Sequence, residues 1–149
     1  MQKRFWLMVF CVMMLLQCSG DTPRHLGVVN GKLAACPNSP NCVSSQTTDK
    51  KRYIEPLHYQ ETLAEARDRL VSVLDSMART RIVTIKDDYV HAEFISRLFR
   101  FVDDVEFYFD GDGRTIHLRS ASRTGYFDLG ANRKRVEVIR KKFVISKTR

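Results

Sequence analysis

The feature that most constrains the fold is a turn signal between two alternating segments. The sequence Asp110-Gly111-Asp112-Gly113 separates residues 99–109 from residues 115–122, and apolar and polar side chains alternate in both segments. Asp-Gly flanked by such alternation is a strong signal for a β-hairpin. Because the side chains of a strand alternate between the two faces of a sheet, the first segment has an apolar and a polar face. The apolar face is made by Val105, Phe107 and Phe109, and the polar face by Asp104, Glu106 and Tyr108.

Further strands and two helices are predicted around this hairpin. Strands are expected at 81–85 and 89–96, and helices at 62–79 and 131–143. The first helix begins with a capping box, in which Thr62 is followed three residues later by Glu65. The order lacks the alternation of strand and helix that a parallel sheet requires. We therefore expect an α+β domain, with an antiparallel sheet of four or more strands, one helix before it and one after it.

The first residues indicate export. Lys3 and Arg4 precede a twelve-residue apolar run over residues 5–16, which is the pattern of a secretory signal. The run is shorter than the roughly 20 residues that a helix needs to span a bilayer. We therefore expect residues 1–17 to be a signal peptide and to lie outside the folded domain.

The end of the apolar run resembles a bacterial lipoprotein signal, in which the cysteine becomes the first residue and carries lipid such as palmitate. Here that cysteine is Cys18, although the usual small residue before it is replaced by Gln17. In this interpretation residues 18–35 are the lipidated cysteine and a flexible tether, and Ser19 favours an outer membrane, facing the periplasm. The alternatives are cleavage after Gly20, which gives a soluble periplasmic protein, and an uncleaved anchor.

Cys36 and Cys42 remain as a pair once Cys11 is assigned to the signal and Cys18 to the lipid. An even number of remaining cysteines in an exported protein predicts a disulfide. This disulfide would close a short loop and stabilise the protein by about 2–2.5 kcal/mol. A redox pair usually has two residues between its cysteines, and a zinc site would need two further ligands close by. We therefore favour a structural disulfide.

The predicted hairpin also suggests pairs across its polar face. A turn over residues 110–113 would place Glu106 opposite His117 and Asp104 opposite Arg119. This polar face is either a solvated surface with ion pairs or the floor of a ligand pocket. A shift of one residue in the register would exchange the two faces.

Residues 119–135 are rich in groups that bind anions. Arginine binds phosphate and carboxylate bidentately, and a helix start attracts the same anions. The candidate ligand-binding residues are Arg119, Ser122, Arg123, Asn132, Arg133 and Arg135. Possible acid partners for these arginines are Asp103, Asp104, Glu106 and Asp128. In the alternative interpretation such pairs only stabilise the fold.

Three blocks of the sequence resemble a known family. They are the segment from Cys36 to Gln46 with both cysteines, the segment Phe101-Val-Asp-Asp-Val-Glu-Phe107, and the arginine-rich segment 119–135. In this order they resemble the family catalogued as domain of unknown function 1499, found in bacteria and plastids, over about residues 33–143. The resemblance thus covers nearly the whole of the single domain that we expect at 36–143, and a basic tail at 144–149 follows that domain. It implies no activity, because none is established for the family.

Enzyme and cofactor patterns are missing from the sequence. No metal-binding spacing or nucleophile motif is present, so we expect no metal and no cofactor, and a hydrolase would have to use Asp104 and Glu106. The net charge of +8 could attract nucleic acid, but export argues against that partner. We expect a non-catalytic envelope lipoprotein that binds an anionic lipid, polymer or small molecule. A structural or partner-docking envelope protein is the alternative, and its protein partners are not predicted.

Overall fold

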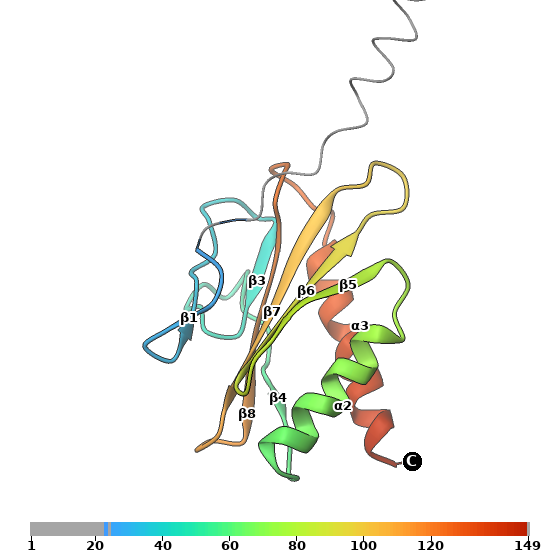
Figure 1. The fold of residues 1–149 in the computed structure, drawn as a ribbon. Coiled ribbons are helices and arrows are strands. Elements are labelled where there is room, and N and C mark those ends of the chain that lie inside the picture. The colour runs from blue at the N-terminus through green and yellow to red at the C-terminus, as the bar shows by residue number, and fades with distance from the viewer. Residues whose placement is uncertain (1–22, 24, 149) are drawn as a thin grey trace, which may run out of the picture.

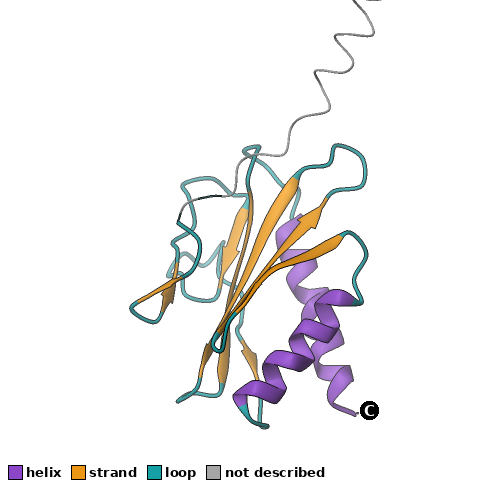
Figure 2. Ribbon diagram, in the orientation of Figure 1, coloured by secondary structure: helices purple, strands orange, loops and turns teal. Residues whose placement is uncertain are grey.

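The computed structural model describes residue 23 and residues 25–148, and the predicted signal peptide and Cys18 lie outside these residues. The main element is a six-stranded antiparallel sheet in the order β3-β8-β7-β6-β5, with β4 also paired to β8. Its strands are β3 (Cys42–Ser44), β4 (Leu57–His58), β5 (Thr80–Ile85), β6 (Tyr89–Ile95), β7 (Val102–Asp110) and β8 (Thr115–Ser122). Two helices cover one face, α2 (Leu63–Asp75) and α3 (Ala131–Ile145), and a short 3-10 helix, η1 (Ser146–Thr148), follows (Figures 1 and 2). The expected α+β class is confirmed.

Local signals explain where the helices begin and end. The Thr62 side chain accepts from the Glu65 amide, and the Glu65 side chain accepts from the Thr62 amide, so the predicted capping box is present. Helix α2 ends at Asp75, before the predicted residue 79, because the chain turns there and Arg79 adopts a left-handed conformation with φ of 60°. Helix α3 starts after Gly130, whose φ of 76° suits a residue without a Cβ.

The hydrophobic core lies between the helices and the apolar face of the sheet. Its largest fully buried side chains include Phe107 and Phe109 of β7, Phe143 of α3, and Leu70 and Leu74 of α2. Burial of each of these side chains contributes about 1.5–3 kcal/mol. All buried apolar residues among those described lie between Leu33 and Phe143, so a chain that starts at Pro23 keeps the whole of this core. No helix among the described residues is both long enough and apolar enough to cross a bilayer.

The register of the β7–β8 hairpin differs from the predicted one. Asp110 pairs with Thr115, so Glu106 lies opposite Arg119, and Asp104 lies opposite Ala121. The cause is the Asp110 side chain, whose Oδ1 accepts the amides of the two residues that follow Gly111 and so keeps Asp110 in the ladder. The prediction was wrong by two positions in the partner strand. An even shift leaves each side chain on its predicted face.

The N-terminal part of the domain packs against the face of the sheet that the helices leave open (Figure 1). A small hairpin forms here from β1 (Val28–Val29) and β2 (Lys32–Leu33). Leu33 is buried, and its amide donates to the Gln46 side chain. The amide of Gly27 donates to Glu106 Oε1 at 2.7 Å. Within residues 18–35, where a tether was expected, the structure thus shows the β1–β2 hairpin and the contacts of Gly27 and Leu33 with the rest of the domain. The predicted disulfide between Cys36 and Cys42 is present, with Cα atoms 5.7 Å apart.

Candidate functional site

The polar face of strands β6, β7 and β8 is buried. It carries Tyr89, His91, Glu93, Asp104, Glu106 and Arg119, and each of these residues is at most 6% exposed. Alternation along the strands places them opposite the helices. Of the two alternatives for this face, the solvated surface does not agree with the structure. Buried charges are tolerated only where they are paired and hydrogen-bonded, so the partners of each group decide what this face can do.

Arg123 neutralises two carboxylates at one end of this face. Its Nε donates to Asp104 Oδ2 at 2.8 Å, and its Nη2 lies 2.7 Å from Asp104 Oδ1 and 2.5 Å from Glu93 Oε1. His91 Nε2 lies 2.8 Å from Asp104 Oδ1. Burial alone would raise the pKa of Asp104, but the hydrogen bonds from Arg123 and His91 outweigh it and lower this pKa. Asp104 is therefore a carboxylate fixed by its partners.

Arg119 and Glu106 form a second cluster in the middle of the face. Arg119 Nη1 lies 3.0 Å from Glu106 Oε2, and Tyr89 Oη donates to Glu106 Oε1 at 2.9 Å. Burial and the neighbouring Glu106 raise the pKa of the Tyr89 phenol far above its ordinary value. Together with the Gly27 amide, these donors occupy both oxygens of Glu106. The cluster links β6, β7, β8 and the N-terminal segment.

Most of the remaining predicted residues form a junction at the start of α3. Asn132 is fully buried, and its Nδ2 donates to the Asn41 carbonyl, Ser122 Oγ and Asp128 Oδ2. Its Oδ1 accepts from Ser120 Oγ at 2.6 Å and from Arg135 Nη1 at 2.7 Å. Arg135 also forms an ion pair with Asp103. The carboxylate of Asp128 accepts the amides of Gly130 and Asn132, so it caps α3.

Arg133 lies apart from these clusters. Its Nη2 donates to the backbone carbonyls of Lys51 and Tyr53, both at 2.9 Å, and so ties α3 to the segment before β4. Arg119, Arg123 and Arg135 each pair with an acid that the sequence suggested as a partner, namely Glu106, Asp104 and Asp103. These side chains connect elements of the fold, and a ligand anion would have to displace a buried carboxylate to reach their charges.

A comparison with known protein families matches one family to most of the domain described above. The family described as Protein of unknown function (DUF1499) matches residues 32–143. The chain belongs to this family. No curated protein was found to be significantly similar to it. The matched part of the DUF1499 protein begins in β2 and ends at Phe143 in α3, so it includes the six-stranded sheet, α2, most of α3 and the disulfide.

The structure of the DUF1499 domain places the two carboxylates of the hydrolase alternative in buried ion pairs. Asp104 and Glu106 share a face, but both are buried and paired with arginine. Neither is placed to exchange a proton with a substrate, because each carboxylate oxygen already accepts a hydrogen bond. Within the described residues, no cluster of three or more His, Cys, Asp or Glu side chains could hold a metal ion.

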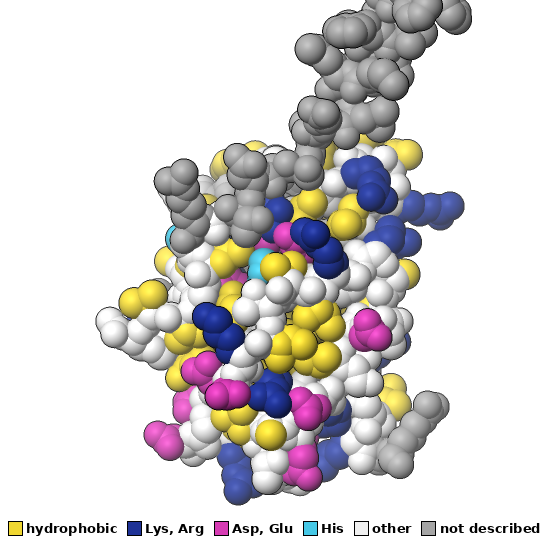
Figure 3. Space-filling model, in the orientation of Figure 1, with side chains coloured by type: hydrophobic (Ala, Val, Ile, Leu, Met, Phe, Trp, Pro, Cys, Tyr) yellow, Lys and Arg dark blue, Asp and Glu magenta, His cyan; other side chains and the backbone are white. Residues whose placement is uncertain are grey.

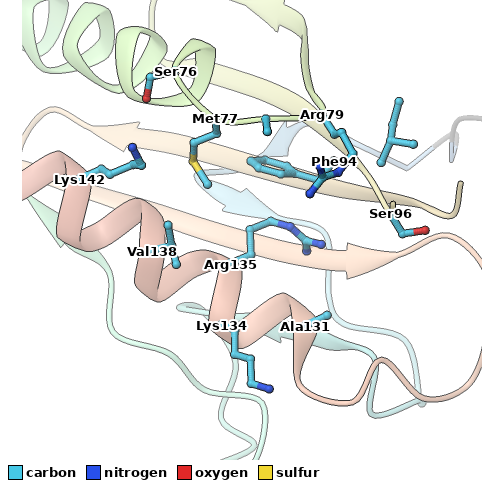
Figure 4. Close-up of a pocket in the computed structure, with 12 residues that line it drawn as sticks. Ser76, Met77, Arg79, Phe94, Ser96, Ala131, Lys134, Arg135, Val138 and Lys142 are labelled. Atoms are coloured by element: carbon cyan, nitrogen blue, oxygen red, sulfur yellow. The ribbon is translucent and has the colours of Figure 1, made fainter. Parts of the chain in front are cut away.

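A groove that the sequence did not reveal lies between α3 and the turn that follows α2, beside the end of β6. It has a volume of about 570 Å³, and we call it the interhelix groove. Its apolar surface includes Met77, Phe94 and Val138, and its cations are Arg79, Lys134, Arg135 and Lys142. Figure 4 shows Met77 on one side and Val138 and Lys142 on the other. The spacing of four residues from Lys134 to Val138 and Lys142 places all three on one face of α3, which is the signal that could have indicated the groove.

Two details define the shape and charge of the interhelix groove. A second groove of about 540 Å³ shares Ser76 and Lys142 with it and continues toward Ile145. The Arg135 guanidinium lies 5.0 Å from the centroid of the Phe94 ring and is already paired with Asp103. None of the described residues that line the interhelix groove is acidic. The groove therefore combines apolar surface with positive charge.

Proposed function

We propose that this protein is a non-catalytic binding module of the bacterial cell envelope. Its ligand is an anionic amphiphile, which is a molecule with an apolar chain and a phosphate or carboxylate head. The observation that carries the proposal is the interhelix groove, in which apolar side chains lie beside Arg79, Lys134 and Lys142, and in which none of the described lining residues is acidic. The predicted arginine cluster supports this role less well, because its charges are already paired.

Each part of such a ligand matches one part of the groove. The apolar chain would cover Met77, Phe94 and Val138, and each buried CH₂ group contributes about 0.8 kcal/mol. The head would lie near Lys142 or Arg79, and a nearby Lys or Arg contributes about 1 kcal/mol toward an anionic head. Lys142 lines both grooves, so the chain of a ligand bound there can extend in either direction.

The cellular location belongs to the same proposal. A disulfide persists in an oxidising compartment such as the periplasm, and the N-terminal sequence resembles a lipoprotein signal. We place the protein on the outer membrane, facing the periplasm and anchored by lipid on Cys18. The alternative is a soluble periplasmic protein that begins after Gly20.

Calorimetric titration with dodecyl phosphate tests the binding site. The protein would be the chain from Pro23 to Arg149, which retains the described core. Lys142→Glu should weaken binding by roughly tenfold or more, because it removes an attraction of about 1 kcal/mol and adds a repulsion. Ethyl phosphate should bind much more weakly than dodecyl phosphate, because it cannot cover the apolar surface.

Lys141→Glu is the matched control. Lys141 is the neighbouring exposed residue of α3 and is not among the residues that line either groove. This variant carries the same change in net charge and should bind dodecyl phosphate almost like the parent protein. Equal weakening by both variants, or no binding by the parent, would contradict the proposed site.

A further inference from the structure

Two loops at one end of the sheet expose large apolar side chains. One loop joins β6 to β7 over residues 96–101, and the other joins β8 to α3 over residues 123–130. The exposed residues are Leu98, Phe99, Phe101, Tyr126, Phe127 and Leu129, with exposures from 41% to 87%. We call these six residues the aromatic end. The loops are neighbours, because the amide of Arg123 donates to the carbonyl of Val102 at 3.1 Å (Figure 1).

The aromatic end is an ordered surface. The Ser96 amide donates to the Phe101 carbonyl at 2.8 Å, and the Phe101 amide donates to Ser96 Oγ at 2.9 Å, which closes the first loop. The rings of Phe99 and Phe101 stack with centroids 5.5 Å apart. Leu129 has a φ of 52° although it is not glycine. Such a backbone costs free energy, yet here it presents an apolar side chain that is 87% exposed.

The charges around the aromatic end are positive. Arg97 and Arg100 are exposed in the first loop. Figure 3 shows Lys or Arg side chains beside hydrophobic ones over the loop between β6 and β7. The acid in the second loop is Asp128, and its carboxylate is used to cap α3. This combination suits the interface of a lipid bilayer, where aromatic rings contact the apolar chains and arginine contacts the anionic headgroups.

We propose that the aromatic end docks onto the anionic surface of a phospholipid bilayer. The rings enter the headgroup region, and Arg97 and Arg100 lie against lipid phosphates. This inference goes beyond the proposed ligand, because it concerns a different surface. The two are nevertheless adjacent, since Ile95, Ser96 and Ala131 line the interhelix groove at this end.

The length of the N-terminal segment supports a bilayer as the occupant. Nine residues lead from Cys18 to Gly27, and they reach at most about 30–32 Å when extended. The amide of Gly27 is bound to Glu106. Glu106 lies four residues, or about 13 Å along the strand, from Val102, where β7 starts. A lipid on Cys18 would therefore keep the domain close to the bilayer while leaving enough chain for the aromatic end to reach it.

Tryptophan fluorescence in reconstituted vesicles tests this docking. Trp6 is the one tryptophan of the chain and lies in the predicted signal peptide, so Trp6→Phe leaves a single new reporter whether or not that segment is removed. Phe99→Trp and Phe127→Trp place the reporter at the aromatic end. Ile85→Trp is the matched control, because Ile85 is also an exposed apolar residue but lies at the end of β5 that is far from the aromatic end. The vesicles contain phosphatidylglycerol and phosphatidylcholine with brominated acyl chains, which quench tryptophan on contact.

The expected result is strong quenching at positions 99 and 127 and little at position 85. Adding Arg97→Gln and Arg100→Asn should reduce the quenching, as should vesicles of phosphatidylcholine alone. Equal quenching at all three positions, or none at any, would overturn the proposal. A blue shift at position 99 that depends on protein concentration and needs no vesicles would also overturn it, because a second copy would then cover the surface. Lys142→Glu should leave the quenching unchanged, which separates this test from that of the groove.

Discussion

Arg119 and Glu106 face each other across β7 and β8 and form an ion pair in which both side chains are at most 3% exposed. An arginine left without this partner would keep a charge in a site that water does not reach. Removing one member of a buried pair is therefore much more costly than the net contribution of the pair itself. The same reasoning applies to Arg123. Both arginines lie in the segment 119–135 that resembles the family, and their buried ion pairs hold the fold together.

Arg119→Ala should lower the free energy of unfolding by about 3–5 kcal/mol, because it leaves Glu106 as an unpaired buried charge. Urea unfolding followed by circular dichroism measures this loss. Arg67→Ala is the matched control, since Arg67 pairs with the exposed Asp68. That variant should lose less than about 1 kcal/mol. A similar small loss for Arg119→Ala would show that the buried pair contributes little to the fold.

Stability should fall in acid because of Asp104 and Glu93. Burial alone would raise both pKa values, but hydrogen bonds from arginine hold them below their ordinary values of 3.8 and 4.5. The unfolded chain therefore binds these protons more readily than the folded one. Their contribution is complete at neutral pH and is lost as the pH falls from the ordinary carboxyl range through the folded pKa values. Urea midpoints measured between about pH 7 and about pH 2 follow this loss.

Asp104→Asn tests the origin of that pH dependence. The amide keeps an acceptor for Arg123 but removes the titrating group, so the acid-dependent loss of stability should become smaller. Asp87→Asn is the control, because Asp87 is fully exposed, and it should retain the parental pH dependence. If Asp104→Asn retained the same dependence, other carboxylates would have to account for it.

Cys36→Ser together with Cys42→Ser should lower the free energy of unfolding by about 2–2.5 kcal/mol, because the unfolded chain loses its short covalent loop. Urea unfolding of the double variant, compared with the oxidised parent, measures the effect. Reduction of the parent by dithiothreitol should reproduce it. A variant as stable as the parent would indicate that the hydrogen bonds of Asn41 and the β3–β8 pairing hold this segment without the disulfide.

Much of the secondary structure could be predicted because its signals are local. The capping box at Thr62 marks the start of α2, and the Asp-Gly turn marks the β7–β8 hairpin. Alternation assigned Glu106 and Phe107 to opposite faces, and an even error in register preserved that assignment. The end of α2 was less predictable, because the left-handed turn at Arg79 depends on the bond from the Ile95 amide to its carbonyl.

The sequence by itself determined the class of the fold, the two faces of the sheet and the cysteine pair, because periodicity and spacing act within a few residues. Only the tertiary structure decided what covers the polar face, since the segment around Gly27 reaches Glu106 from 79 residues away. It also decided that Arg119 and Arg123 are paired with acids, and that Met77, Phe94 and Lys142 surround one groove. Such contacts join residues distant in the chain, and they form only when packing of the whole domain brings those residues together.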